Sequence, residues 1–197
     1  MWETRFEVND MEYLQKPEVI ALLKRSFEYG NREAHLALLT MYATGARVSQ
    51  VIALKGIDVI PDPSTGGHRI RIGAAKRGRT RTYRVLVSPN PVLDMRDLVA
   101  LAHQRGASML FGGLTRHYLH ILIKRWAREA GLHESMVHCH TIRHSSAMRV
   151  YERTQRIGAV SGFLAHSDPA AAYIYVQEND GQLADEAMAA VFAQPNS

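Results

Sequence analysis

Apolar residues recur every three or four positions over most of the chain, the spacing that buries one face of an α-helix. A first helix is expected to begin at about Pro17, a residue suited to a first helical turn, and to end near Gly30. A second is expected from about Arg32 to Gly45, where a glycine can end a helix. The remaining predicted helices cover residues 48–54, 94–104, 116–130, 141–152, 156–164, 169–176 and 182–192.

A different pattern follows Gly56, where apolar and polar residues alternate, as at Ile70 and Ile72. Three short segments share this pattern and predict strands at 57–60, 69–73 and 80–87. They would form a small antiparallel sheet with a basic turn between its second and third strands. Because helices precede and follow the strands, the chain is expected to be a mainly helical α+β domain.

Length and composition narrow the class of protein. The 197 residues, 46% of them hydrophobic, suffice for one compact domain with a real core. The longest nearly apolar run, 36–46, is far shorter than the roughly 20 residues that cross a bilayer, and residues 1–10 lack the apolar segment of a secretory signal. Cys139 is the only cysteine, which excludes an intrachain disulfide. We therefore expect a cytoplasmic protein without a membrane partner.

The distribution of charge says more than the net value of +5. After Tyr175 the chain carries acidic residues and no lysine or arginine. The predicted hairpin is the opposite, because its basic residues are accompanied by no acidic one. Such a surface favours a polyanion, since phosphates release counterions when lysine and arginine bind them. A solvated hairpin on an ordinary protein explains the charge equally well. The basic hairpin residues are Arg69, Arg71, Lys76, Arg77, Arg79, Arg81 and Arg84.

Four short stretches carry residues suited to chemistry. Arg47 follows the glycine that ends the second helix, Lys76 lies at the tip of the basic hairpin, and 138–144 holds three histidines and an arginine. Leu164-Ala165-His166 is followed by Tyr173 and Tyr175. Three of the stretches have an ordinary structural explanation: an arginine solvates a helix end, a lysine solvates a turn, and late tyrosines complete a core.

The histidine stretch admits a metal site as an alternative. His140 and His144 are four residues apart, so they share one face of a helix. The metalloprotease pattern requires a glutamate after the first histidine, and Thr141 stands there instead. A phosphate-binding group that includes Arg143 explains the stretch better, and we expect neither a metal nor another cofactor.

In this order, the four stretches resemble the catalytic domain of the tyrosine recombinase (phage integrase) superfamily, over residues 12–177. T-G-A-R-V-S-Q at 44–50 is similar to the first-arginine box, H-T-I-R-H at 140–144 to the H-x-x-R-H box, and L-A-H at 164–166 to the late histidine box. Tyr175, nine residues after His166, stands where the family keeps its nucleophile. The sequence departs from the family at Gln50, where an acidic residue is frequent, at Ala165, where glycine is usual, and at residues 169–172.

The resemblance implies a site-specific recombinase that cleaves and rejoins DNA through a 3′-phosphotyrosine, without metal or nucleotide. Tyr175 would be the nucleophile, and Arg47 and Arg143 would bind the non-bridging phosphate oxygens. The remaining implied catalytic residues are Lys76, which protonates the 5′ leaving oxygen, His140, which manages the tyrosine proton, and His166, which donates a hydrogen bond to the phosphorane. The arginines of the basic hairpin would contact DNA.

The resemblance also implies an organisation and a set of partners. Residues 1–197 are expected to form a single catalytic domain with an acidic C-terminal tail at 178–197, without the separate N-terminal helical domain of many relatives. The partners would be double-stranded DNA and further copies of the chain, in a tetramer on two DNA sites associated with the nucleoid. The tail helix at 182–192 would dock on a neighbouring copy or on its own domain. Two other functions stay open, a type IB topoisomerase-like relaxase and a catalytically inactive DNA-binding regulator.

Overall fold

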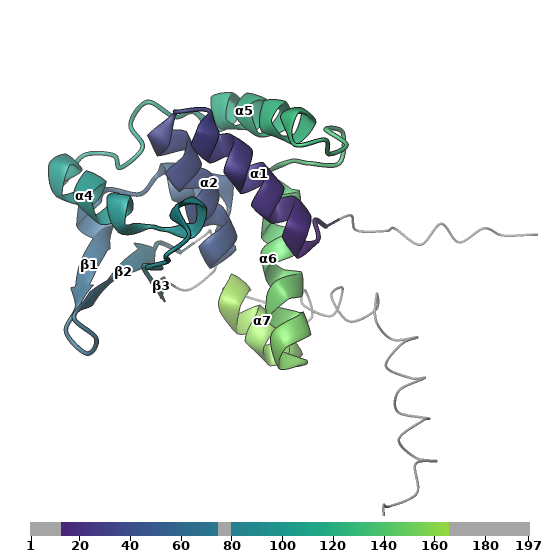
Figure 1. Ribbon diagram of the computed structural model, residues 1–197. Helices are drawn as coiled ribbons and strands as arrows, with labels where there is room; N and C mark the ends of the chain where they lie inside the picture. The colour runs from purple at the N-terminus through teal and green to yellow at the C-terminus, as the bar shows by residue number, and fades with distance from the viewer. Residues whose placement is uncertain (1–12, 75–79, 166–197) are drawn as a thin grey trace, which may run out of the picture.

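The computed structural model describes residues 13–74 and 80–165 of the chain. Within these ranges the chain forms helices and one small antiparallel sheet, as the sequence predicts. Helices α1 and α5 lie side by side along one edge of the molecule, the sheet lies beside α4, and α6 leads away from the helical layer to α7 (Figure 1). The α-helices are α1 (Lys16–Glu28), α2 (Arg32–Thr44), α3 (Val48–Ile52), α4 (Arg96–Arg105), α5 (Arg116–Glu129), α6 (Cys139–Thr154) and α7 (Ile157–Leu164).

Local signals set the ends of the first two helices. Pro17 lies in the first turn of α1, where the carboxylate of Glu18 accepts a hydrogen bond from the backbone N–H of Gln15 at 2.7 Å. The side chain of Asn31 caps α2 by accepting from the N–H of Ala34 at 3.1 Å. Gly45 ends α2 with a φ of 61°, in the left-handed region, which confirms the predicted stop.

The sheet has the strand order β1-β2-β3, and both strand pairs are antiparallel. Its strands are β1 (Val59–Asp62), β2 (Gly67–Ile72) and β3 (Arg81–Arg84). Ile70 lies opposite Val59 on one side and Tyr83 on the other, and Ile70 and Ile72 are buried. The alternation in the second strand therefore faces the core, as predicted.

The first strand lies two residues later than the sequence predicts, and the third strand is shorter than predicted. Gly56–Asp58 forms a 3-10 turn, because the N–H of Ile57 donates to the carbonyl of Gly106 at 2.8 Å instead of joining the sheet. β3 ends at Arg84, and two residues later the carbonyl of Leu86 accepts from the N–H of Met95 at 2.9 Å. The start of the first strand and the end of the third are thus set by backbone contacts outside the sheet.

The core has a large and a small part. The large part surrounds α2, whose leucines at 36, 38 and 39 are at most 1% exposed, and includes the fully buried Trp126 of α5. The small part joins the C-terminal half of α6 to α7. Ser146 of α6 connects the two, because its hydroxyl donates to the carbonyl of Tyr42 on α2 at 2.6 Å. These contacts therefore fix α6 against α2 and α7 against α6.

Two of the predicted helices, 169–176 and 182–192, lie outside the described residues. No helix in the part of the chain that the structure describes is both long and apolar enough to span a bilayer.

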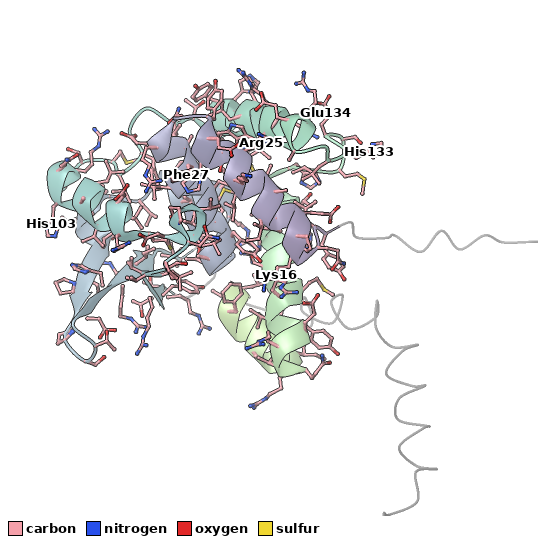
Figure 2. All side chains as sticks on the ribbon, in the orientation of Figure 1. Lys16, Arg25, Phe27, His103, His133 and Glu134 are labelled. Carbon is pink, nitrogen blue, oxygen red and sulfur yellow. The ribbon has the colours of Figure 1, made fainter. Side chains whose placement is uncertain are left out.

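Figure 2 shows His103 at one edge of the molecule, on α4, and His133 and Glu134 at the opposite edge, after the C-terminal end of α5.

Candidate active site

Arg47 is positioned by the junction between α2 and α3. It is the N-cap residue of α3 in an extended conformation, and its side chain is exposed. The junction lies tightly against the end of α7: a Cβ on Gly45 would lie 2.7 Å from atoms of both Phe163 and Leu164. Glycine is therefore required here twice, by the positive φ and by the close approach.

His140 and Arg143 project from the first turns of α6. His138 caps this helix, because its Nδ1 accepts from the N–H of Thr141 at 3.2 Å. His140 is exposed, whereas Arg143 is only 4% exposed. The ring of His140 meets the ring of His144 edge to face at 5.0 Å. His140 and Arg143 thus have distinct environments on one helix.

The guanidinium of Arg143 joins two other site segments. It donates to the backbone carbonyl of Gly45 and, at 3.1 Å, to that of Leu164. These carbonyls end α2 and α7, the helices that precede Arg47 and His166 in the sequence. Ala165, with a φ of 53°, closes α7 in the left-handed conformation that glycine adopts most easily. Arg143 therefore holds together the two backbone segments that precede Arg47 and His166 in the sequence.

One cavity of about 690 Å³ brings the described site residues together. Arg47, His140 and Arg143 all line it, although they come from different parts of the sequence. None of the lining residues is acidic, so the cavity is suited to an anion such as a phosphodiester. The lining residues are Arg47, Val48, Ser49, Arg116, His117, His120, His138, Cys139, His140 and Arg143.

The electrostatics of the cavity act directly on His140. Although His140 is exposed, the loss of part of its surrounding water lowers its pKa, and the positive charges of Arg143 and Arg47 lower it further. Its imidazole is therefore mainly neutral at pH 7 and able to accept a proton. Burial raises the pKa of the neighbouring Cys139, so that side chain stays a thiol at neutral pH.

The histidines of the site do not assemble into a metal centre in the described part of the chain. Across residues 13–74 and 80–165, no group of three or more His, Cys, Asp or Glu side chains is arranged to hold a metal ion. His140 and His144 meet through their rings instead.

The predicted hairpin residues are only partly described. Arg69 forms an ion pair with Asp62 at 3.3 Å, and Arg71 forms one with Asp58 at 3.0 Å, so both have partners within the domain. Arg84 is exposed on β3, and Arg81 is half-buried. The predicted residues that lie outside the described ranges are Lys76, Arg77, Arg79, His166 and Tyr175.

Sequence reasoning missed one wall of the cavity, the N-terminal end of α5. Arg116, His117 and His120 line the cavity there, after the N-cap Thr115, whose hydroxyl accepts from the N–H of Tyr118 at 3.0 Å. A helix N-terminus carries partial positive charge, which adds to that of Arg116. The run T-R-H-Y-L-H was the available signal: a capping residue followed by basic and imidazole side chains in the first turns.

Tyr83 is a second residue that the sequence did not single out. Its hydroxyl donates to the carbonyl of Phe163 at 2.5 Å, and its ring meets that of Phe163 edge to face at 5.8 Å. Burial raises the pKa of Tyr83, so the hydroxyl remains a donor. The end of α7 is therefore attached to β3 as well as to Arg143.

Solved structures share this arrangement of elements. The XerH site-specific recombinase bound to its difH substrate in a pre-cleavage complex superposes with a TM-score of 0.70 at 20% identity, covering 89% of this chain and 53% of that one. The catalytic domain of bacteriophage HP1 integrase gives 0.62 at 19% identity, covering 94% and 98%. The fold is that of a tyrosine recombinase catalytic domain, which confirms the predicted fold class.

Sequence comparison then gives the family. The model of the phage integrase family matches residues 12–182, and the chain belongs to that family. It is 32% identical over 143 residues to the tyrosine recombinase XerD of Ralstonia nicotianae, covering 68% of this chain and 45% of that protein. The XerD of Corynebacterium glutamicum is 33% identical over 144 residues, with 68% and 45% covered. The chain thus spans about half the length of these relatives.

Proposed function

We propose that this chain is the catalytic domain of a site-specific DNA recombinase, which cleaves and rejoins DNA strands through a covalent 3′-phosphotyrosine. The observation that carries the proposal is the shared cavity of Arg47, Arg143 and His140. Two guanidinium groups beside a neutral imidazole suit a reaction in which a phosphodiester gains charge and an attacking hydroxyl loses its proton. Membership of the phage integrase family supports the same reaction class.

The proposed reaction is a pair of transesterifications. The hydroxyl oxygen of Tyr175 attacks the scissile phosphorus, the bond from phosphorus to the 5′ oxygen breaks, and the phosphate stays on the 3′ side as a phosphotyrosine. The 5′ oxygen leaves as a free hydroxyl. A 5′ hydroxyl from a second DNA end then attacks the phosphotyrosine, which restores the diester and the tyrosine. One ester bond is made for each one broken, so no nucleotide is consumed.

Each residue that the resemblance implies to be catalytic has a proposed part in that step. Arg47 and Arg143 bind the two non-bridging oxygens, because a guanidinium offers paired donors in one plane. His140 accepts the proton of the tyrosine, as its lowered pKa permits. Lys76 would protonate the 5′ oxygen, and His166 would donate a hydrogen bond to the phosphorane.

DNA binding would extend beyond the scissile phosphate. Arg116 and His117 at the start of α5 line the cavity beside the site and are exposed, which suits contact with neighbouring phosphates. On the hairpin, Arg84 is exposed and available, whereas Arg69 and Arg71 would have to share their charge with Asp62 and Asp58. The hairpin set as a whole stays a prediction.

The proposed working assembly is a tetramer that holds two DNA sites. Because the proposed substrate is DNA, the enzyme would act in the cytoplasm, on the nucleoid.

The other open functions give different products: a topoisomerase-like relaxase changes only the linking number of a plasmid, and an inactive regulator binds DNA without cutting it.

A suicide substrate tests the proposal. Duplexes from the DNA that flanks the gene would carry a nick close to the cleavage position, so that a short fragment diffuses away and traps the covalent complex. Wild-type protein should form an adduct that survives denaturation, and Tyr175→Phe should abolish it while DNA binding persists. Tyr173→Phe, the matched control, should retain the adduct.

Three results would contradict the proposal. One is an adduct that survives Tyr175→Phe and disappears with Tyr173→Phe, since the assignment of Tyr175 as the nucleophile would then be wrong. Another is a cleavage reaction that EDTA stops and Mg²⁺ restores, because the proposed step uses no metal. Relaxed plasmid without recombinant product would favour the topoisomerase-like function instead.

A further inference from the structure

Tyr83 on β3 contacts the C-terminal end of α7, a helix that lies on the side of α6 facing the sheet (Figure 1). Its hydroxyl donates to the backbone carbonyl of Phe163 at 2.5 Å, and the two rings meet edge to face at 5.8 Å. The ring of Tyr83 packs against the large part of the core, and that of Phe163 packs against the small part. The contact is therefore a second connection between the two parts of the core.

Two neighbouring carbonyls at the end of α7 are bound by different side chains. The last carbonyls of a helix find no donor within the helix, so they need one from elsewhere. Tyr83 supplies the donor for Phe163, and Arg143 supplies the donor for Leu164 at 3.1 Å. Because each peptide group is a rigid plane, holding the first carbonyl limits how far the second can move. The hydroxyl of Tyr83 thus restricts the group to which Arg143 is bound.

The guanidinium of Arg143 lies close to this contact. Its side chain is 4% exposed, donates to the carbonyl of Gly45 as well, and lines the cavity of the candidate active site. Burial raises the pKa of the Tyr83 hydroxyl, and the positive charges of Arg81 and Arg143 oppose that rise. The phenol and the guanidinium therefore act on the same helix end from short range.

We propose that Tyr83 is a positioning residue, which holds the end of α7 so that Arg143 presents its guanidinium to the scissile phosphate. The inference rests on the proposed function, because it takes Arg143 as the ligand of a non-bridging oxygen. A guanidinium forms paired hydrogen bonds only when its plane is correctly directed, so a displaced anchor turns both donors away. A displacement of about 1 Å is enough to slow a reaction strongly.

A role of Tyr83 in packing alone gives a different expectation. Tyr83→Phe keeps the ring, which contacts Phe163 and lies on β3 opposite Ile70 of β2. The substitution removes only the hydroxyl and its bond to α7. Packing alone therefore predicts an almost unchanged enzyme, whereas positioning predicts a folded enzyme that cleaves more slowly.

The first test measures the anchor without any DNA. Hydrogen–deuterium exchange of the full chain should be faster for the backbone amides of residues 162–165 in Tyr83→Phe than in the wild type. The matched control is Tyr29→Phe, which removes a half-buried hydroxyl that accepts from Arg125 at 3.3 Å outside the cavity. It should leave exchange at 162–165 unchanged. Equal protection of 162–165 in wild type and Tyr83→Phe would overturn the proposal.

The second test is single-turnover cleavage of a nicked duplex at saturating DNA. Tyr83→Phe should lower the rate constant about tenfold and leave the affinity for DNA near the wild-type value, because no charge is removed. Partial unfolding would instead lower the amount of adduct at completion and leave the rate constant unchanged. Tyr29→Phe should cleave at the wild-type rate. Incorporation of p-aminophenylalanine at position 83 should restore the rate, because its amine keeps an N–H donor for Phe163.

A double-mutant cycle shows whether the hydroxyl acts through Arg143. In the Arg143→Ala background, Tyr83→Phe should cause no further loss, because the group that it positions is already gone. In the Arg47→Ala background it should still cost about tenfold. If the first double variant does not fold, Arg143→Lys provides the same comparison, because lysine lacks the planar pair of donors.

The outcomes separate this inference from the proposed function. A wild-type rate constant in Tyr83→Phe would overturn the positioning role, and so would an undiminished loss in the Arg143→Ala background. A loss that p-aminophenylalanine does not reverse would overturn it as well, since the donor would then not be what matters. Failure of the wild type to form any adduct would refute the proposed function, and the exchange experiment would still decide whether Tyr83 holds the end of α7.

Discussion

Arg143 donates a hydrogen bond from its buried guanidinium to the backbone carbonyl of Gly45, 98 residues earlier in the chain. A second bond from the same group reaches Leu164. The residue that would bind the scissile phosphate is thus also a structural link between the ends of two helices. Arg47, by contrast, is exposed, and its position depends on backbone contacts rather than on its own side chain.

The two arginines should therefore differ in their effect on stability. Arg143→Ala leaves two buried carbonyls without their donor, and we expect it to lower the free energy of unfolding by roughly 1–3 kcal/mol. Arg47→Ala should change it by less than about 0.5 kcal/mol. Both variants should lose about 10²–10³-fold in cleavage, since each removes one donor to the transition state.

Urea unfolding followed by circular dichroism, together with single-turnover cleavage, checks this prediction. Arg143→Lys serves as the intermediate variant, because it keeps the charge but not the planar pair of donors. Equal stabilities of Arg47→Ala and Arg143→Ala would show that the bonds to Gly45 and Leu164 contribute nothing to the fold.

Part of the described cavity could be predicted from the sequence, because Arg47, His140 and Arg143 follow local signals. The positive φ of Gly45 and the helical spacing of His140 and Arg143 are properties of short segments. The N-terminal end of α5 could not be predicted as part of the site, since its place beside α6 depends on how helices pack. The first strand begins two residues later than predicted for the same reason: the carbonyl of Gly106 that binds Ile57 comes from a distant turn.

Two side chains that donate to distant backbone carbonyls illustrate the same limit. Gln50 stands out in the sequence as a departure from the family pattern, but its partner Gly73 is a backbone carbonyl with no distinguishing residue type. Tyr83 reads as an ordinary strand residue, and its bond to Phe163 spans 80 residues. Backbone acceptors of this kind leave no mark in the sequence, so only the fold reveals them.

Gly45 should tolerate substitution much less well than Gly30, although both have positive φ values, 61° and 82°. Gly30→Ala meets no atom within 4 Å and should cost only the roughly 1–2 kcal/mol of the left-handed conformation. Gly45→Ala adds a clash at 2.7 Å with Phe163 and Leu164, so the loss should be clearly larger.

Thermal unfolding of the two alanine variants gives the comparison directly. Gly45→Ala should also reduce cleavage in any fraction that stays folded, because the clash displaces the end of α7 from Arg143. Equal melting temperatures for the two variants would mean that Gly45 packs less tightly against the end of α7 than the structure shows.

The buried His35 should make the domain sensitive to acid. Its side chain is 1% exposed, its Nδ1 lies 2.8 Å from the hydroxyl of Ser26, and burial together with Arg32 lowers its pKa to about 4. Between about pH 6.5 and pH 4 the unfolded chain binds this proton and the folded one does not, so stability falls as the pH falls through that window. The loss attributable to His35 is at most about 3 kcal/mol.

Urea titrations at a series of pH values measure this effect. His35→Gln should remove most of the slope between pH 6.5 and 4, whereas His133→Gln, at an exposed position after α5 (Figure 2), should preserve it. A wild-type slope that survives in His35→Gln would assign the acid sensitivity to other groups.

The start of α5 should contribute a DNA phosphate contact. Arg116 is exposed and lines the cavity that holds Arg47 and Arg143, so Arg116→Ala should weaken binding to a duplex and reduce the slope of log K against log salt by about 1. Arg128→Ala is the matched control: it removes the same charge from the same helix about 18 Å away, where Arg128 pairs with Glu134 at 2.9 Å. The measurement is fluorescence anisotropy at several salt concentrations, with the chain intact. Because counterion release depends on contact and not on net charge alone, the control should leave the salt slope unchanged. Equal losses from both variants would reduce the effect to net charge and remove α5 from the DNA interface.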